Sequence, residues 1–318
     1  MDVRMTKVDL ITGFLGSGKT TFLKRYARYF MDKGQHIGII ENDYGAVNVD
    51  MMLLSDLEGE NCELEMVSGG CDADCHLRRF KTKLIALGMQ GLDRVIIEPS
   101  GIYDVDEFFD VLNDEPLDRW YEIGSVITIV DSNLPDDMSD DSEYLLSSQI
   151  SRAGSIVLSK VPGDACGEKT GSIKARLDAS LASFGCDRIP DGKITAKNWN
   201  DLTGDDFARI ASSGYKTHSI EKRNVTDEGA FKSLYFMNLD LGGEGLKEEI
   251  DKLFCDETFG KIMRVKGFFK DERGSWSQIN ATENEMRISP LSEGQNVIIV
   301  IGEKMNEEKI TEFFDRFR

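Results

Sequence analysis

The sequence predicts the α/β fold class: a doubly wound, mostly parallel sheet, followed by a smaller α+β domain. Three observations predict it. Five short runs rich in Val and Ile alternate with helical patterns, a glycine-rich turn follows the first of these runs, and the alternation stops after about residue 213. Strands that alternate with helices are typical of parallel sheets. The length of 318 residues suits two domains better than one.

The expected strands of the first domain are continuous apolar runs, which indicate strands buried on both faces. Between them, apolar residues recur at helical spacing, as Phe22, Tyr26 and Phe30 do in residues 20–30. The same spacing predicts helices over 75–87 and 172–184. The expected strands are 7–12, 36–42, 94–98, 125–131 and 155–160.

The pattern of the remaining chain predicts a change of architecture. We expect a first domain over residues 1–213, a polar linker over 214–229 and an α+β domain over 230–318. In the last part, strands are grouped instead of alternating with helices. The strands are expected at 233–241, 261–269, 275–281, 285–290 and 295–302, and the helices at 245–254 and 307–317. The acidic stretch 135–143 is interpreted as an exposed loop.

Composition excludes several classes of protein. Asp and Glu outnumber Lys and Arg by 57 to 38, and the net charge of −19 argues against a nucleic-acid partner. No apolar run reaches the roughly 18 residues of a spanning helix, so we expect no membrane partner. The first residues lack the pattern of a signal peptide, which predicts a cytoplasmic location. The six cysteines are then expected to be free, metal-bound or redox-active.

The segment "GFLGSGKTT" (13–21) fits the phosphate-binding pattern G-x-x-x-x-G-K-[ST] between an expected strand and helix. Its glycines allow backbone amides to turn toward phosphate oxygens, and the helix N-terminus adds positive potential. Lys19 is expected to reach the β- and γ-phosphates and to be catalytic, and the Thr20 hydroxyl to bind Mg²⁺. The predicted nucleotide-binding residues here are Gly13, Gly16, Ser17, Gly18, Lys19, Thr20 and Thr21.

Two acidic residues end predicted strands. Glu98 ends the strand 94–98, and a carboxylate there faces the ligand crevice of a parallel sheet. We therefore expect Glu98 to complete the Mg²⁺ site and to act in catalysis; the alternative is a helix-capping or surface acid. Asp131 ends the strand 125–131, where a ligand role and a turn-forming role are equally favoured.

The segment "CDADCHLRR" (71–79) combines two cysteines with an aspartate and a histidine. Cys75 is expected near the start of the helix 75–87, where the positive helix end and the following arginines favour thiolate. Cys71, Asp74, Cys75 and His76 could form a mixed set of ligands that suits Zn²⁺, Co²⁺ or Ni²⁺. The alternative is a polar turn in which Asp74 caps the helix and the thiols bind nothing.

Taken in order, "GFLGSGKTT", "IIENDYGAVNVD" (39–50), "CDADCHLRR", "VIIEPSG", "VITIVD" and "QISRAGSIVLSK" resemble the CobW-type P-loop GTPases. These are relatives of the nickel-insertion GTPases, and "RVKGFF", "GSW" and "VIIVIG" resemble their C-terminal domain. The resemblance implies a P-loop NTPase fold, slow GTP hydrolysis, and delivery of zinc or cobalt to a client metalloenzyme or apo-protein. It also implies that 42–50 is a nucleotide-sensing switch in which Asp43 or Asp50 approaches Mg²⁺ or the transferred metal.

Two motifs depart from the family pattern. The usual Gly-Cys-x-Cys-Cys is replaced by "GCDADC", which has one more residue and Asp74 in place of the middle cysteine. The guanine-reading Asn-Lys-x-Asp is replaced by "SKVP": Lys160 is kept, Ser159 stands at the asparagine position and Pro162 at the aspartate position. Loss of that acceptor weakens guanine selectivity, although Asp164 lies two residues on. GTP is expected, with ATP as the alternative.

Our hypothesis for the mechanism is that bound triphosphate and Mg²⁺ hold the switch segment and the thiol segment in one arrangement, which hydrolysis releases. Metal affinity then depends on nucleotide state and, by linkage, nucleotide affinity depends on metal. Three other functions compete with this hypothesis. One is a small-molecule kinase that uses the same loop. Another is an iron–sulfur redox activator, in which Cys71 and Cys75 share a cluster across a homodimer. The third is a non-catalytic nucleotide sensor that partners a metalloenzyme.

Overall fold

The computed structural model describes residues 5–43, 49–69, 73–161, 166–217, 220, 231–241, 246–271 and 274–318. Cys71, Pro162 and Asp164 therefore lie outside the described residues. The chain divides into two compact units, Met1–Arg223 and Asn224–Arg318. Residues 214–217, at the start of the expected linker, hydrogen-bond to the first unit: Gly214 O accepts from Val126 N at 3.0 Å, and Lys216 N donates to Arg152 O at 3.0 Å.

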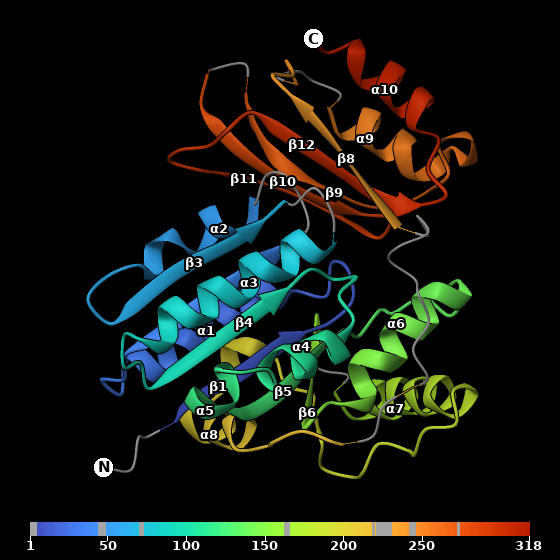
Figure 1. Cartoon of the computed structure of the whole chain (residues 1–318). Coiled ribbons are helices and arrows are strands. Elements are labelled where there is room, and N and C mark those ends of the chain that lie inside the picture. The colour runs from blue at the N-terminus through green and yellow to red at the C-terminus, as the bar shows by residue number, and fades with distance from the viewer. Residues whose placement is uncertain are drawn as a thin grey trace. The chain divides into compact units, whose positions relative to one another are not determined.

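The first unit is built on a parallel sheet with the strand order β3–β2–β4–β1–β5–β6–β7 (Figure 1). This confirms the predicted α/β class with a doubly wound parallel sheet. The phosphate-loop strand β1 lies at the centre, and β3 lies at an edge. The strands are β1 (Thr6–Thr12), β2 (Ile37–Asp43), β3 (Cys62–Ser68), β4 (Arg94–Pro99), β5 (Tyr121–Asp131), β6 (Ser155–Ser159) and β7 (Ile194–Thr195).

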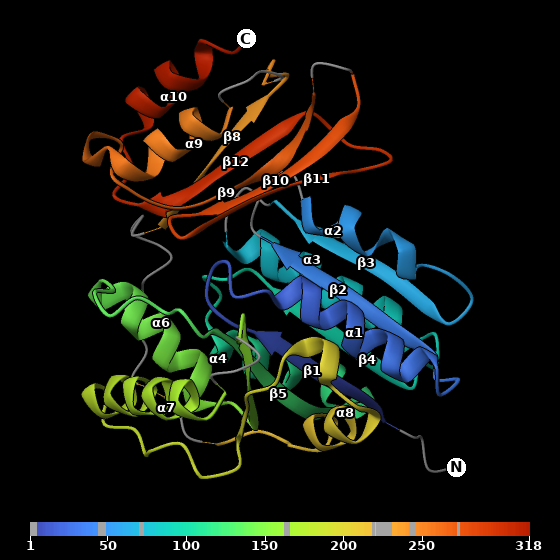
Figure 2. The same cartoon turned by 180° about the vertical axis from the view of Figure 1, so that it is seen from behind.

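Helices cover both faces of this sheet (Figures 1 and 2). Successive strand residues point to opposite faces, so Ile39 and Ile96 join one core whereas Ile40 and Ile97 join the other. The first face carries α1 (Lys19–Met31), α2 (Val49–Leu54) and α8 (Gly204–Ala211); the second carries α3 (Ala73–Gly88), α4 (Val105–Leu112) and α5 (Leu117–Trp120). A further core joins α6 (Asp140–Ser151) and α7 (Cys166–Ser183) to β6. Short 3₁₀ turns are Ser55–Leu57 and Trp199–Asp201.

The expectation of a loop over the whole stretch 135–143 is wrong. The loop ends at Ser139, whose hydroxyl accepts from Ser142 N and caps α6. Asp140, Asp141 and Glu143 then lie in the first turn of that helix, where the positive helix end favours negative side chains. In α1, by contrast, Phe22, Tyr26 and Phe30 are all buried, as their spacing predicts.

A buried ion pair joins two central strands. Asp9 of β1 is fully buried and accepts hydrogen bonds from Tyr26 Oη at 2.7 Å and Ser125 N at 2.8 Å. The guanidinium of Arg94, at the start of β4, also binds this carboxylate, and it stacks 4.4 Å from the centre of the Phe30 ring. Burial raises the pKa of Asp9, and the charge of Arg94 opposes that rise. The cluster ties β1, β4, β5 and α1 together.

The second unit is an antiparallel sheet with the order β11–β10–β9–β12–β8, backed by α9 and α10 (Figure 1). The predicted smaller α+β domain is therefore confirmed as a fold. The strands are β8 (Phe231–Met237), β9 (Lys261–Lys270), β10 (Trp276–Thr282), β11 (Glu285–Pro290) and β12 (Val297–Glu303). The helices are α9 (Leu246–Cys255) and α10 (Glu307–Asp315), with a 3₁₀ turn at Glu257–Phe259.

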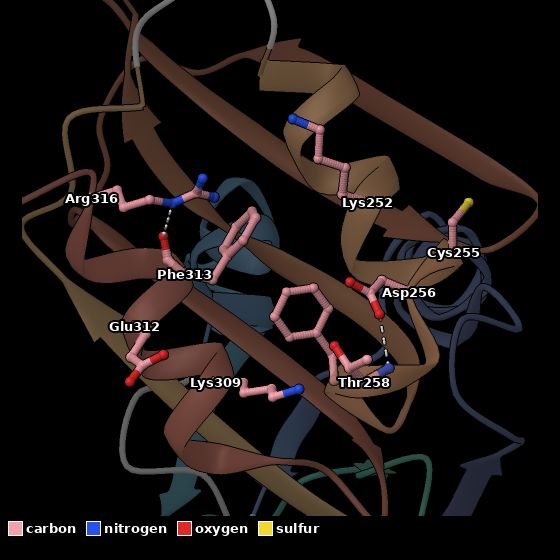
Figure 3. A pocket seen from close by; sticks show the side chains of 9 residues that line it. Lys252, Cys255, Asp256, Thr258, Lys309, Glu312, Phe313 and Arg316 are labelled. Carbon is pink, nitrogen blue, oxygen red and sulfur yellow. Dashed lines mark hydrogen bonds between the residues drawn. The ribbon is translucent and has the colours of Figure 1, made fainter.

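A cavity of about 560 Å³ lies between α9 and α10 (Figure 3). Phe259 and Phe313 form an apolar part of its wall, and Lys252, Lys309 and Arg316 stand around them. No helix in the described part of the chain is long and apolar enough to cross a membrane.

Candidate functional site

The loop between β1 and α1 depends on glycine at two positions. Gly13 has φ = 149°, and a Cβ there would lie 2.3 Å from the Ile129 carbonyl oxygen of β5. Gly18 has φ = 96°, and a Cβ there would lie 3.1 Å from the Trp199 ring. Both backbone conformations are ones that other residues rarely adopt. The loop is therefore packed closely against its neighbours and leads directly into α1.

The polar groups of this loop fit a polyphosphate. Lys19 is 6% exposed, and its ammonium group folds back to donate to Gly13 O at 3.1 Å. The Ser17 hydroxyl is buried and, among the described residues, has no hydrogen-bond partner. A buried orphan hydroxyl beside an ammonium group at a helix N-terminus suits an oxygen-rich anion. Gly16, with φ = 73°, belongs to the same turn, whereas Thr21 is exposed on α1.

The predicted Mg²⁺ ligands lie together. Thr20 Oγ1 donates to Glu98 Oε1 at 2.8 Å, and Glu98 is 3% exposed near the carboxyl end of β4. This end of a parallel sheet is where such folds bind their ligands. Hydroxyl and carboxylate oxygens are the ligands that Mg²⁺ prefers in proteins. The donor set therefore fits Mg²⁺ beside the phosphate loop.

The ends of β5 and β6 are joined next to the loop. Lys160 has φ = 55°, and its ammonium group lies 2.7 Å from Asp131 Oδ2. Ser132 donates through its backbone N to Ser159 O at 3.1 Å and through its hydroxyl to Lys160 O at 2.9 Å. A Cβ on Gly18 would lie 3.8 Å from Ser159 Cβ, so Ser159, one of the predicted base-binding residues, borders the loop. Asp131 thus fixes the position of Lys160.

The Trp199 side chain packs beside the phosphate loop and contacts both β6 and α1. Its indole Nε1 donates to the Leu158 carbonyl of β6 at 2.9 Å, and its ring packs edge-on against Phe22 of α1. The same ring is the group that a side chain at Gly18 would contact. Sequence reasoning did not select Trp199, because nothing in its local pattern relates it to residues 13–18.

His76 is the most constrained of the predicted metal ligands. It is 2% exposed in the first turn of α3, with Nδ1 3.0 Å from Gly69 O and Nε2 2.7 Å from the side-chain Oδ1 of Asn42. Burial lowers its pKa; Arg79 acts in the same direction, and Gly69 O and Asp43 oppose it. The ring is therefore neutral at pH 7.

The protonation of this ring also fixes the orientation of Asn42. The carbonyl oxygen of Gly69 can only accept, so Nδ1 carries the proton and Nε2 has a lone pair. We accordingly assign the Asn42 amide with its nitrogen toward Nε2, since the two ends of an amide are chosen from their hydrogen bonds. That orientation also gives a partner to the amide nitrogen, which otherwise lies buried without one.

A continuous series of contacts links the phosphate loop to α3. Thr20 contacts Glu98, and two residues further along the chain Ser100 N donates to Asn42 O at 2.8 Å. The side chain of Asn42 then contacts His76, which follows Cys75. Sequence reasoning missed this contact. An asparagine at a strand end and a histidine beside a cysteine were the available signals, but they are 34 residues apart.

The other predicted metal ligands are dispersed. Cys75 is half-buried in the first turn of α3, as expected, and Asp74 lies exposed within that turn. Asp43 is half-buried at the end of β2, and Asp50 is buried in the first turn of α2. Within the described ranges no three His, Cys, Asp or Glu residues form a metal-binding group. Cys71 is outside those ranges, so its role stays a prediction.

A cavity of about 370 Å³ opens beside Cys75 between β3 and α3. The side chains around the thiol are basic: Arg78, Arg79 and Lys83 all line the cavity. Arg79 also donates to Ser68 O at 2.8 Å, and Lys83 pairs with Glu65 at 2.5 Å, so the charges are held in place by β3.

The parallel sheet, the glycine loop and the Thr20–Glu98 contact define a P-loop nucleotide-binding protein. A family model for the nucleotide-binding domain of CobW/HypB/UreG proteins matches residues 7–181, more than half of the chain. The chain therefore belongs to the CobW/HypB/UreG family, as the sequence motifs predicted.

Three named proteins are similar in sequence to this chain. The zinc chaperone YeiR of Escherichia coli is 31% identical over 157 residues, covering 49% of this chain and 47% of YeiR. The zinc chaperone YjiA of the same organism is 32% identical over 184 residues, covering 54% of each chain. The zinc-regulated GTPase metalloprotein activator 1 of Schizosaccharomyces pombe is 23% identical over 321 residues, covering 90% of this chain and 77% of the relative. The chain thus matches about half the length of the first two.

Proposed function

We propose that this protein binds and slowly hydrolyses GTP with Mg²⁺, and carries a divalent metal of the zinc or cobalt class to a client metalloenzyme or apo-protein. The observation that carries the proposal is the Thr20–Glu98 contact beside the phosphate loop, connected through Asn42 to the helix that bears Cys75. Zinc is favoured over cobalt because two relatives are zinc chaperones and a third is a zinc-regulated GTPase metalloprotein activator.

In this proposal the loop amides and the Ser17 hydroxyl bind phosphate oxygens, and the Lys19 ammonium group leaves Gly13 O to do the same. Thr20 and Glu98 would hold Mg²⁺, which neutralises charge on the phosphates when bound. Asp43 and Asp50 are proposed as further carboxylates that respond to the nucleotide. Because the loop is already folded in the protein, binding requires little reorganisation of its backbone.

Ser159 and Lys160 are proposed to border the purine base, with Asp131 orienting Lys160. GTP is preferred to ATP because one relative is a zinc-regulated GTPase metalloprotein activator, and because the motifs of this chain resemble those of P-loop GTPases. The absence of an aspartate at position 162 predicts a smaller preference for guanine than an intact Asn-Lys-x-Asp motif gives.

The metal cargo is proposed to bind Cys75 and His76, with Cys71 and Asp74 as further ligands. A thiolate, an imidazole and an oxygen ligand form a set that tetrahedral Zn²⁺ accepts. The basic cavity beside Cys75 suits the approach of an acidic client segment that would take over the metal.

The test is purification under anaerobic, chelator-free conditions, with bound metal and nucleotide measured together, followed by GTP and ATP turnover. We expect bound zinc, a slow GTPase rate, and a loss of at least 100-fold in Lys19→Ala, because the ammonium group acts on the reacting phosphates. Lys24→Ala on the same helix, where the lysine pairs with Asp56 at the surface, is the matched control.

Unchanged turnover in Lys19→Ala would refute the assignment of the loop. A brown protein that contains iron and sulfide would instead support the redox activator, and phosphate transfer to an added acceptor would support a kinase.

A further inference from the structure

The two ring nitrogens of His76 have different hydrogen-bond partners, and this difference decides which nitrogen can bind a metal. A histidine that binds a metal commonly donates its other N–H to a backbone carbonyl, which fixes the ring orientation. Nδ1 of His76 has such a partner in Gly69 O, at 3.0 Å. Nε2 is therefore the nitrogen left to bind a metal, and it is the one that Asn42 occupies.

We propose that Asn42 is a latch that withholds Nε2 of His76 from the metal, and that the state of the nucleotide site opens or closes it. The inference rests on the proposed function, and it adds the residue that regulates the metal site. With the latch closed, Asn42 contacts Nε2; with the latch open, the metal takes the place of Asn42.

Because both side chains are buried, Nε2 of His76 is expected to have one of two partners, Asn42 or the metal. Asn42 is 1% exposed and His76 is 2% exposed, so water does not readily replace their hydrogen bond. If Asn42 moved away and nothing took its place, Nε2 would be a buried acceptor without a donor, which is unfavourable. A metal ion at Nε2 removes that penalty. Intermediate positions satisfy neither state, so Nε2 is bound either to Asn42 or to the metal.

The nucleotide site can act on Asn42 because the two share a backbone connection. In the register of β2 and β4, Glu41 lies beside Glu98 and Asn42 beside Pro99. Ser100 N then donates to Asn42 O at 2.8 Å. A shift of Glu98 toward a ligand at Thr20 therefore moves the strand end that holds the backbone of Asn42. Asp43, a candidate for the nucleotide-responsive carboxylate, is the next residue.

The experiment measures zinc affinity of the full chain by competition with a chromogenic chelator, with no nucleotide, with GDP, and with a non-hydrolysable GTP analogue. In the wild type we expect the affinity to differ between these states. Asn42→Ala should bind zinc about five-fold more tightly in the weakest-binding state, since one competing hydrogen bond is gone. It should also lose most of the dependence on nucleotide. His76→Ala should bind zinc more weakly in every state.

Two further measurements separate the latch from a general loss of structure. Co²⁺ absorption should show the same ligand set in Asn42→Ala as in the wild type, and an altered set in His76→Ala. Lys81→Met removes a surface ion pair elsewhere on α3, with Asp114, and should behave as the wild type. If Asn42→Ala does not fold, as judged by far-UV circular dichroism, Asn42→Ser takes its place, because serine is too short to reach Nε2.

The outcomes distinguish the latch from the function on which it rests. If Asn42→Ala keeps the full nucleotide dependence of the wild type, or if His76→Ala binds zinc as tightly as the wild type, the latch is refuted and the metallochaperone proposal stands. If the wild type binds neither zinc nor GTP, the proposed function itself is refuted.

Discussion

Replacing Arg94 with Met should destabilise the first unit by about 3–5 kcal/mol at pH 7, the usual cost of leaving a buried charge without its partner. Asp9 is fully buried, and Arg94 is its partner of opposite charge in this cluster. Tyr26 and Ser125 would still donate to the carboxylate, but neither carries a charge. The methionine would keep part of the contact with Phe30, so the loss is mainly electrostatic.

The loss should depend on pH in a defined direction. Burial raises the pKa of Asp9 above its ordinary value of 3.8, and Arg94 limits that rise. Without Arg94 the pKa rises further, so the folded variant binds a proton more readily than the unfolded chain does. A raised pKa of an acid costs stability as pH rises from the unfolded pKa through the folded one. The variant should therefore lose more stability at pH 7 than at pH 5, where Asp9 is closer to neutral.

The assay is urea unfolding followed by far-UV circular dichroism at both pH values. Arg28→Met is the matched control, because Arg28 pairs with Asp56 at the exposed surface and should cost less than about 1 kcal/mol. Adding Asp9→Asn to Arg94→Met should recover part of the loss, since no charge is then buried. A loss in Arg94→Met below about 1 kcal/mol at pH 7, or an equal loss at both pH values, would contradict the reasoning.

Three further outcomes are expected. Glu98→Gln should lower GTP turnover by about 100-fold and raise the Mg²⁺ concentration needed, because a carboxylate oxygen beside Thr20 is lost; a Mg²⁺ titration that matches the wild type would contradict this. Asp131→Asn should weaken nucleotide binding about five-fold by freeing Lys160, measured with a fluorescent GTP analogue, and an unchanged Kd would count against the role of this pair. Asp206, which completes the capping box of α8 with the N-cap Thr203, has its pKa lowered to about 2, chiefly by Lys197, so its contribution to stability is present above pH 4 and lost as pH falls from 4 to 2. Asp206→Ala should cost about 1 kcal/mol at pH 7 and almost nothing at pH 2, by urea unfolding, and an equal cost at both would be inconsistent with this assignment.

The central strands were predictable because a strand buried on both faces needs an almost continuous apolar run, as β4 and β5 have. The edge strand β3 was missed, since Glu63 and Glu65 interrupt its apolar residues and only an edge tolerates them. α6 was missed because polar residues lie on its buried face, so no apolar spacing marks the helix. These residues are Ser147, Ser148 and Gln149.

The phosphate loop was predictable because its residues are contiguous and each has a local reason to be there. Glu98 could be placed from the rule that parallel strands present their carboxyl ends at one edge. The contact of Asn42 with His76 was not predictable, because it depends on how far β2 extends and on how the first turn of α3 is oriented. Both are set by packing of distant segments, which no local pattern encodes.

The position of Trp199 has a practical consequence. The indole lies beside the position that a side chain at Gly18 would take and donates a hydrogen bond to β6, so its surroundings change when the loop changes. The protein thus contains an intrinsic optical probe of its own loop. With Trp120 and Trp276 replaced by Phe, the emission of Trp199, followed in a stopped-flow instrument with unmodified nucleotide, would separate the arrival of the ligand from the slower chemical step and from product departure.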